Sequence, residues 1–432
     1  MKFPSTIDIN VYKAYINTAA ATSAMRNHGI NAIDLHWETT ESLKDLCIRI
    51  LAENWSNQPI YRALDAFPED QRQLLDSLDV STLKLSDLVA HIQGDDGFWK
   101  RCFIARWPNF VLTNTLGKKW IRIFLEKHLS ETLENMKPVD YTQEKMQQLI
   151  DLCAPHIEEL KINHLQPGTT ESHGDHIPFD YILANLAELK YVNLTYDVKS
   201  VGKNFVLGCS NISDNDIKLL AHGLGRSYEL QEFHLHSSKL DSHMLQLLAH
   251  SLEKHQYLHT VNLLHCRCGD TGLRAFLDAI SNDSFPALRT LILTNNFLSS
   301  DGALLLAQSL RKRKIEKLDI RLNPITSEGA AAIFHILNDI PIRELNMACC
   351  SLDETIGQFL FKVIRENKTL KSLNISANHL GQKIGEELLR IIPQNKVIQE
   401  LDIRNSDISY AIKSGIDSSI LENRDRETFE WS

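Results

Sequence analysis

The second half of the chain repeats one pattern of apolar and polar positions seven times. Each copy reads apolar-x-x-apolar-x-apolar-x-x-(Asn/Cys/Ser)-x-apolar, and residues 370–380 show it most clearly. The copies begin at Leu230, Leu258, Leu288, Ile315, Ile342, Leu370 and Ile398, which are 27 to 30 residues apart. A motif that recurs at this interval predicts a solenoid in which each copy forms one structural unit.

Each copy combines the signal of a strand with the signal of a helix. The first half alternates apolar and polar residues, as at 318–320, which favours a strand. The second half, as at 301–310, spaces its apolar residues like an amphipathic helix. This order and length are typical of the long class of leucine-rich repeat. We therefore expect an α/β leucine-rich-repeat horseshoe of the ribonuclease-inhibitor-like type, with parallel strands inside and helices outside.

The ninth position of each copy holds a small polar residue or a thiol. These residues are Ser238, Cys266, Asn296, Asn323, Cys350, Asn378 and Ser406. The chain leaves the strand at this point, so we expect these side chains to bond backbone groups of the turn. The third, fifth and seventh positions should instead face the concave surface.

Charged and imidazole side chains on that concave surface are our candidate protein-binding residues. They are His234, His236, Asp319, Arg321, Asp402 and Arg404. The predicted surface lacks the basic stripe and stacked aromatic residues of a nucleic-acid groove. An arginine here could act as the arginine finger of a GTPase activator. The simpler role is an ion pair, of Arg321 with Asp319 and of Arg404 with Asp402.

Residues 1–150 contain no repeat, and we predict a helical docking domain there. Apolar spacing predicts helices over residues 42–54, 69–78 and 119–136. Three of the six tryptophans lie within 22 residues, close to an arginine. These side chains could fill a small core, or they could form a docking surface, because Trp and Arg are enriched in interface hot spots. The candidate contacts are Trp99, Arg106, Trp107 and Trp120.

We predict that the solenoid covers residues 151–425, with regular copies at 230–425. Two irregular strands are expected at 157–162 and 189–194, separated by a loop at 166–180 that is rich in Gly, Pro, His, Thr and Ser. A polar stretch that begins at Asn423 can cover the open end of the stack. Residues 426–432 are predicted to form a C-terminal tail.

Composition narrows the functional classes. The net charge of −9 and the pI of about 6.1 argue against nonspecific binding to nucleic acid or to an anionic membrane. The sequence shows neither a secretory signal nor an apolar run long enough to span a membrane, so we expect a soluble protein.

The chemistry-bearing residues predict no catalytic, cofactor or metal site. The eight cysteines form no CxxC pair, which is typical of reduced thiols in a cytosolic-type compartment. Histidines are dense at 222–265, but they fall on opposite sides of a repeat and cannot converge on a metal. A second group of histidines lies in or beside the 166–180 loop. Phosphate-binding GxxxxGK[ST] and nucleophile GxSxG motifs are missing from the sequence.

Several non-repeating segments resemble one family. They are residues 43–55, the block 95–107, the segment 117–128, and Tyr196-Asp197-Val198-Lys199 followed by Gly202, Asn204 and Phe205. From about residue 35 to 425 the chain resembles the T-complex-associated testis-expressed protein family, which is the leucine-rich-repeat subunit 5 of the axonemal nexin–dynein regulatory complex. The 166–180 loop is shorter and less acidic than in mammalian members, and the C-terminal tail is short.

The resemblance implies a non-catalytic scaffold or linker in the axoneme of a cilium or flagellum, where it helps to regulate dynein-driven motility. The implied partners are other subunits of that complex, the doublet microtubule and neighbours of the dynein arms. One alternative stays open from the residues. Phe67, Leu74 and Leu75, followed by the Trp-rich block, look distantly like an F-box. Residues 60–110 would then bind a ubiquitin-ligase adaptor, and the repeats would hold its substrates.

Overall fold

The computed structural model describes residues 42–55, 67–78, 83–111, 117–166, 175–196, 212–280, 285–311 and 313–430. The chain divides into two compact units, Met1–Gln93 and Gly94–Ser432. Some residues singled out above lie outside the described ranges, namely Asp197, Val198, Lys199, Gly202, Asn204, Phe205, Cys209 and 167–174 of the predicted loop.

The first unit is helical in its described residues, with α3 (Leu43–Glu53), α4 (Pro68–Ser77) and α5 (Leu85–His91). Helices α3 and α4 pack together, and an ion pair joins Lys44 Nζ to Asp70 Oδ1 at 2.5 Å. The helices predicted at 42–54 and 69–78 are therefore confirmed. Helix α5 was not predicted, because seven residues are too few to show a helical period.

The second unit begins with α6 (Asp96–Arg106), α7 (Trp120–Asn135) and α8 (Gln143–Cys153). The Asp95 carboxylate caps α6 by accepting a hydrogen bond from the backbone N–H of Phe98 at 2.6 Å. Helix α7 confirms the helix predicted at 119–136. The predicted domain boundaries at 150 and 425 stay predictions, although compactness joins α6, α7 and α8 to the repeats.

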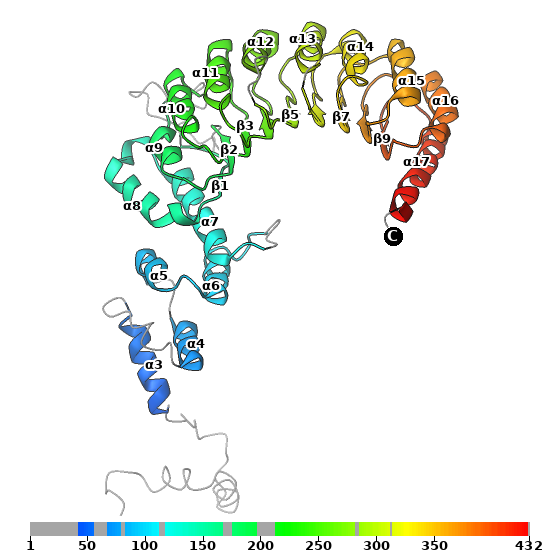
Figure 1. Cartoon of the computed structure of the whole chain (residues 1–432). Helices are drawn as coiled ribbons and strands as arrows, with labels where there is room; N and C mark the ends of the chain where they lie inside the picture. Colours follow the sequence, from blue (N-terminus) through cyan, green and yellow to red (C-terminus); the bar gives the residue numbers. More distant parts are fainter. Residues whose placement is uncertain are drawn as a thin grey trace, which may run out of the picture. The chain divides into compact units, whose positions relative to one another are not determined.

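Nine parallel strands follow in the described residues, and they lie side by side in chain order. They are β1 (Glu159–Ile162), β2 (Tyr191–Thr195), β3 (Glu232–His236), β4 (Thr260–Asn262), β5 (Thr290–Ile292), β6 (Lys317–Asp319), β7 (Glu344–Asn346), β8 (Ser372–Asn374) and β9 (Glu400–Asp402). Strands β1 and β2 confirm the two irregular copies. Within the second unit the strands line the inner side of an arc and the helices its outer side (Figure 1). The predicted α/β leucine-rich-repeat horseshoe is confirmed.

One helix row covers the outside of this sheet. It comprises α9 (Phe179–Ala184), α10 (Asp214–Leu224), α11 (Ser242–Leu252), α12 (Gly269–Ile280), α13 (Ser300–Leu310), α14 (Thr326–Ile336), α15 (Gly357–Glu366), α16 (Gln382–Ile391) and α17 (Tyr410–Glu430). The predicted loop at 166–180 was too long at its end, because α9 already begins at Phe179. Helix α17 runs through residue 426, where we placed the start of the tail.

The core of the arc is a set of apolar rows that cross from strand to strand. Leu318, Leu345, Leu373 and Leu401 are register partners on β6 to β9, and each is at most 6% exposed. A strand so short cannot bury such a row by itself. Neighbouring copies do so together, and this makes the stack cooperative.

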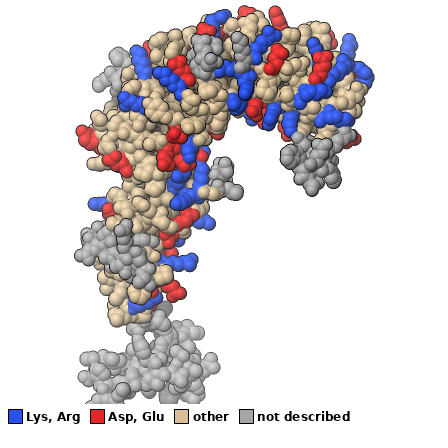
Figure 2. All heavy atoms as spheres, viewed as in Figure 1, with Lys and Arg blue, Asp and Glu red and all other residues tan. Residues whose placement is uncertain are grey.

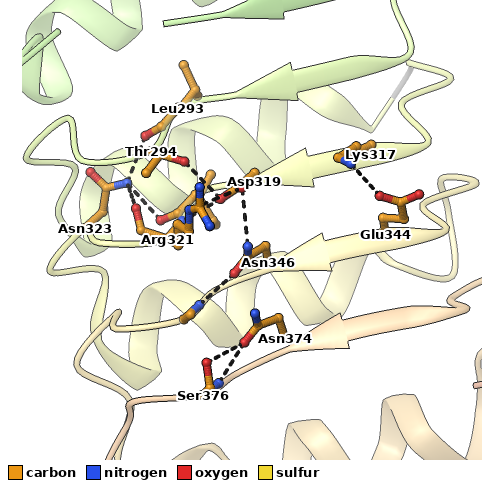
Figure 3. Close-up of polar contacts among 12 residues, drawn as sticks. Leu293, Thr294, Lys317, Asp319, Arg321, Asn323, Glu344, Asn346, Asn374 and Ser376 are labelled. Atoms are coloured by element: carbon orange, nitrogen blue, oxygen red, sulfur yellow. Dashed lines mark hydrogen bonds and ion pairs between the residues drawn. The ribbon is translucent and has the colours of Figure 1, made fainter. Parts of the chain in front are cut away.

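The ninth-position side chains form the predicted turn ladder. The Asn323 Oδ1 atom accepts hydrogen bonds from the backbone N–H groups of Asn296 (2.8 Å) and Leu298 (3.1 Å). Its Nδ2 group donates to the carbonyls of Leu293 (2.9 Å) and Ile320 (2.8 Å), as Figure 3 shows in part. The equivalent side chains also bond turn backbone, and they are Ser238, Cys266, Asn296, Cys350, Asn378 and Ser406. The structural role predicted for this position is confirmed.

The residue just before the ladder position is left-handed in every regular copy. These residues are Ser237, His265, Asn295, Leu322, Cys349, Ala377 and Asn405, with φ between 49° and 60°. A non-glycine residue rarely adopts this conformation. The turn ladder on either side holds the backbone there.

Helix α7 closes the open edge of the sheet. The Glu126 Oε1 atom accepts hydrogen bonds from the backbone N–H groups of Glu158 (3.1 Å) and Glu159 (2.9 Å). One face of the helix continues this contact, because Glu134 Oε1 accepts the backbone N–H of Asn163 at 2.7 Å. Unpaired strand edges favour aggregation, so α7 protects the start of the solenoid.

Candidate protein-binding surface

The first candidate surface lies on the C-terminal part of the concave face, along β6 to β9. We call it the arginine surface and define it by its seventh-position residues, Arg321, Ala348, Ser376 and Arg404. Below it, each fifth-position side chain accepts the backbone N–H of the seventh residue of its own strand. The accepting residues are Asp319, Asn346, Asn374 and Asp402, at 3.0 to 3.2 Å.

The arginines of this surface are exposed, whereas their carboxylate partners are largely covered. The Arg321 Nε atom lies 3.5 Å from Asp319 Oδ2, and their side chains are 46% and 11% exposed. The Arg404 Nη2 atom lies 2.6 Å from Asp402 Oδ2, with exposures of 68% and 22%. Burial opposes ionisation of Asp402, but the Arg404 hydrogen bonds outweigh it and lower the carboxyl pKa. The simpler role predicted for both arginines is confirmed.

Neighbouring strands are tied together beneath this surface, as Figure 3 shows. The Asp319 carboxylate accepts hydrogen bonds from the Thr294 hydroxyl (3.0 Å) and from Asn346 Nδ2 (3.3 Å). At the strand starts, Lys317 Nζ lies 2.7 Å from Glu344 Oε2. Basic and acidic side chains are interspersed over the face seen in Figure 2.

The second candidate surface lies nearer the N-terminal end of the concave face. We call it the histidine cluster and define it as Tyr191, Glu232, His234, His236 and Asn262. The His234 Nδ1 atom is 3.1 Å from Asn262 Nδ2, and its Nε2 atom is 3.1 Å from Glu232 Oε2. Because an amide nitrogen can only donate, Nδ1 accepts and the proton sits on Nε2, which donates to Glu232. His234 is 4.8 Å from Tyr191 and 5.9 Å from His236 between ring centroids.

Two polar atoms of the histidine cluster have no hydrogen-bond partner among the described residues. They are His236 Nε2 and Asn262 Oδ1, and both atoms are buried. Burial, with a smaller contribution from the neighbouring His234, lowers the pKa of His236 to about 4. His236 is therefore neutral at physiological pH. The sequence identified both histidines, but Tyr191 was missed because its copy is irregular.

The four candidate residues of the Trp-rich block differ in burial and in their contacts. Trp99 is fully buried against Phe124, with ring centroids 5.2 Å apart, so it serves the core. Trp107 and Arg106 meet on the Glu131 carboxylate, at 3.1 Å and 2.8 Å, and the guanidinium carbon lies 4.8 Å from the Trp107 ring centroid.

Trp120 is partly exposed, and Lys100 Nζ lies 5.4 Å from its ring centroid. The core interpretation is confirmed for Trp99, and the docking role of the other three residues stays a prediction. Trp99 fills the core, and the other three side chains reach the surface.

One histidine outside the concave face, His255, has a structural role. His255 is buried, with ring nitrogens 3.1 Å from the carbonyl oxygens of Leu252 and Leu224. Among the described residues, no group of three or more His, Cys, Asp or Glu could hold a metal ion. No helix in the described ranges has the length and apolar character needed to cross a membrane. The seven cysteines that the structure describes are free thiols.

Comparison with known proteins agrees with the repeats. A leucine-rich-repeat family model matches residues 311–334 and 366–389. Dynein regulatory complex subunit 5 of Macaca fascicularis is 29% identical over 254 residues, which are 54% of this chain and 49% of that protein. Dynein regulatory complex subunit 5 of Mus musculus is 31% identical over 54% of this chain and 50% of that protein.

More distant matches complete the comparison. Dynein regulatory complex subunit 5 of Chlamydomonas reinhardtii is 24% identical over 48% of this chain and 50% of that protein. The chain spans about half the length of the curated relatives it matches. A crystal structure of the yeast Rad7 and Elc1 complex covers 86% of this chain and 96% of that chain, with 13% identity and a TM-score of 0.42.

The F-box alternative gains no support from these relatives. The suspected segment, 60–110, also spans the division between the two compact units after Gln93. The repeats, the parallel sheet and the named relatives instead agree with one another. Over about half its length the chain is similar to the dynein regulatory complex subunit 5 proteins, and two of its segments match a leucine-rich-repeat model.

Proposed function

We propose that this protein is a non-catalytic scaffold or linker subunit of the axonemal nexin–dynein regulatory complex. In this role it resides in the axoneme of a cilium or flagellum and helps to regulate dynein-driven motility. The observation that carries the proposal is the match to proteins named dynein regulatory complex subunit 5 in two mammals and an alga.

The geometry supports a scaffold role. Most candidate side chains of the concave face are engaged in ion pairs or hydrogen bonds with neighbouring side chains, namely His234, Asp319, Arg321, Asp402 and Arg404. A catalytic group would need a free, tuned side chain within reach of a reacting atom. A rigid curved surface with exposed arginines is instead suited to holding another protein.

We further propose two contact regions for neighbouring subunits. The first is the concave face, through the histidine cluster and the arginine surface. The second is the surface of α6 and α7 around Arg106, Trp107 and Trp120, where exposed Phe110 adds apolar area. The expected partners are other subunits of the complex, the doublet microtubule and neighbours of the dynein arms. We expect neither nucleic acid nor a membrane among the partners.

Fractionation of motile cilia tests the proposal. A tagged full-length protein should stay with axonemes after detergent extraction and should leave them in high salt. It should also be lost from axonemes that lack the cross-bridge between doublets. A variant with Arg390→Glu on the outer helix α16 serves as a control. It changes the charge of the protein but leaves the concave face intact, so it is compared with the unmodified sequence. Recovery of the protein only in the soluble cytosol would contradict the proposal.

A further inference from the structure

The two arginines of the arginine surface lie a fixed distance apart, and the row between them holds small side chains. Arg321 and Arg404 occupy equivalent positions two residues past the ends of β6 and β9, so three strand intervals separate them, which is about 14 Å at about 4.8 Å per interval. Between them the same row holds only Ala348 and Ser376, which are half-buried. Two exposed cations thus flank a shallow stretch of small side chains.

The two carboxylates beneath this seventh-position row already accept hydrogen bonds from other groups of the protein. Asp319 receives bonds from Thr294, Asn346 and the backbone N–H of Arg321. Asp402 receives the Arg404 backbone N–H together with Nε (2.9 Å) and Nη2 (2.6 Å) of the same residue. The Asp319 and Asp402 side chains are 11% and 22% exposed, whereas Arg321 and Arg404 are 46% and 68% exposed, so the cations of each pair are the groups more open to a partner.

Both arginines keep donors for a partner. Arg404 directs Nε and Nη2 at Asp402, and its Nη1 group makes no hydrogen bond to another residue that the structure describes. Arg321 approaches Asp319 through Nε at 3.5 Å, and its side chain is 46% exposed. An arginine that is already oriented loses less entropy when it binds a carboxylate, and its planar fork matches that group.

We propose that the arginine surface binds an acidic peptide segment of a partner protein, with carboxylates about 14 Å apart that reach Arg321 and Arg404 together. This inference rests on the proposed protein-binding role of the concave face and adds the chemistry of the partner. A single-stranded nucleic acid is a poorer fit. The four residues that define the surface include no aromatic ring on which bases could stack.

The test uses the full-length protein and a fluorescein-labelled glutamate-rich dodecapeptide, read by fluorescence anisotropy. The key variants are Arg321→Glu/Arg404→Glu and the milder Arg321→Gln/Arg404→Gln. The matched control is Arg365→Glu/Arg390→Glu, because both of those arginines are exposed and pair with Glu387 on the outer helices. The two Glu double variants change the net charge equally.

We expect the concave Glu variant to weaken peptide binding about 10-fold or more and the outer variant less than about 2-fold. The Gln variant should also weaken binding, and circular dichroism establishes that it is folded. An equal loss in the two Glu variants would overturn the inference, as would unchanged binding by the Gln variant. Tighter binding of a dodecauridylate than of the peptide would overturn it in favour of RNA.

This assay is independent of axonemal location. Arginine-dependent peptide binding by a protein that is absent from axonemes would keep the inference and reject the proposed function. An axonemal protein whose peptide binding ignores Arg321 and Arg404 would give the reverse result.

Discussion

The two parts of the concave face, the histidine cluster and the arginine surface, share one backbone arrangement but differ in how their polar side chains are bonded. In the histidine cluster, His234 bonds to Asn262 on the next strand and to Glu232 on its own strand, while His236 Nε2 and Asn262 Oδ1 stay buried without a partner among the described residues. In the arginine surface, the fifth-position side chain bonds the backbone of its own strand, and the seventh-position arginine extends into solvent.

This difference assigns distinct roles to the two parts. A surface whose donors and acceptors already satisfy each other gains little from a polar partner, because every new bond must replace an old one. A surface with oriented, exposed donors loses little on binding. We therefore expect the histidine cluster mainly to stiffen the arc and the arginine surface to supply most of the contact with the partner.

The largest effect on stability should come from the turn ladder. Its residue beside the arginine surface is Asn323, and its residue beside the histidine cluster is Ser238. Asn323→Ala removes three donated and two accepted hydrogen bonds beside the arginine surface and leaves buried backbone groups unpaired. We expect a loss of about 2–4 kcal/mol in the free energy of unfolding. Urea denaturation followed by circular dichroism measures it.

The histidine side of the ladder supplies the comparison. Ser238 lies beside His236 and donates to its carbonyl at 2.9 Å. Ser238→Ala should cost only about 0.5–1.5 kcal/mol, because one neutral hydrogen bond is lost. If the two alanine variants had equal denaturation midpoints, the ladder would not be stronger under the arginine surface.

A second, smaller effect should appear at the N-terminal end of the sheet, where α7 covers β1, and it should depend on pH. Burial raises the pKa of Glu126, in the cap beside β1, to about 7 from its usual 4.5, and nearby Lys118 only partly offsets this. Between pH 4.5 and 7 the folded state therefore keeps a proton on Glu126 that the unfolded state has already released. The stability contribution is complete below pH 4.5 and is lost as the pH rises through 7, by roughly 1–3 kcal/mol.

Replacing Glu126 by Gln should remove this loss, since the amide oxygen can still accept the N–H groups of Glu158 and Glu159. Thermal melts of both proteins between pH 4.5 and 8 provide the measurement. Parallel pH profiles for the variant and the wild type would show that Glu126 does not titrate in this range.

Sequence reasoning recovered the elements whose signal repeats and missed those set by packing. The period located β3 to β9 and the ladder position, because each regular copy must bury the same apolar row, whereas β1 and β2 were predicted from irregular copies. It could not indicate the left-handed residue before the ladder. Leu322 and Ala377 have no preference for that conformation, and only their place in the turn imposes it.

The candidate sites show the same limit. Trp99 and Trp107 have the same side chain, but the first faces the core of the unit and the second reaches Glu131 near the surface. Likewise the sequence proposed the ion pairs of Arg321 and Arg404. It did not show that the carboxylates are covered while the guanidinium groups stay exposed, since this depends on hydrogen bonds between strands.

A third prediction concerns His236 alone. His236→Leu removes a buried ring nitrogen that has no partner among the described residues, so we expect a gain of about 0.5–1 kcal/mol at pH 7.5. The lowered pKa of His236 means that the unfolded state binds more protons between pH 6.5 and about 4. The wild type should therefore lose stability as the pH falls through this window, and the variant should lose less.

The smallest effect on stability should belong to the residues with the largest expected effect on binding. Arg321→Ala and Arg404→Ala each remove an exposed side chain whose ion pair is screened by solvent. We expect no measurable shift of the urea midpoint for either variant at physiological salt. A clear loss of stability would mean that these arginines hold the strands together, and the charge-reversal binding experiment would then report folding. An unchanged midpoint with weakened peptide binding would separate the two parts of the concave face as we propose, one that maintains the shape and one that meets the partner.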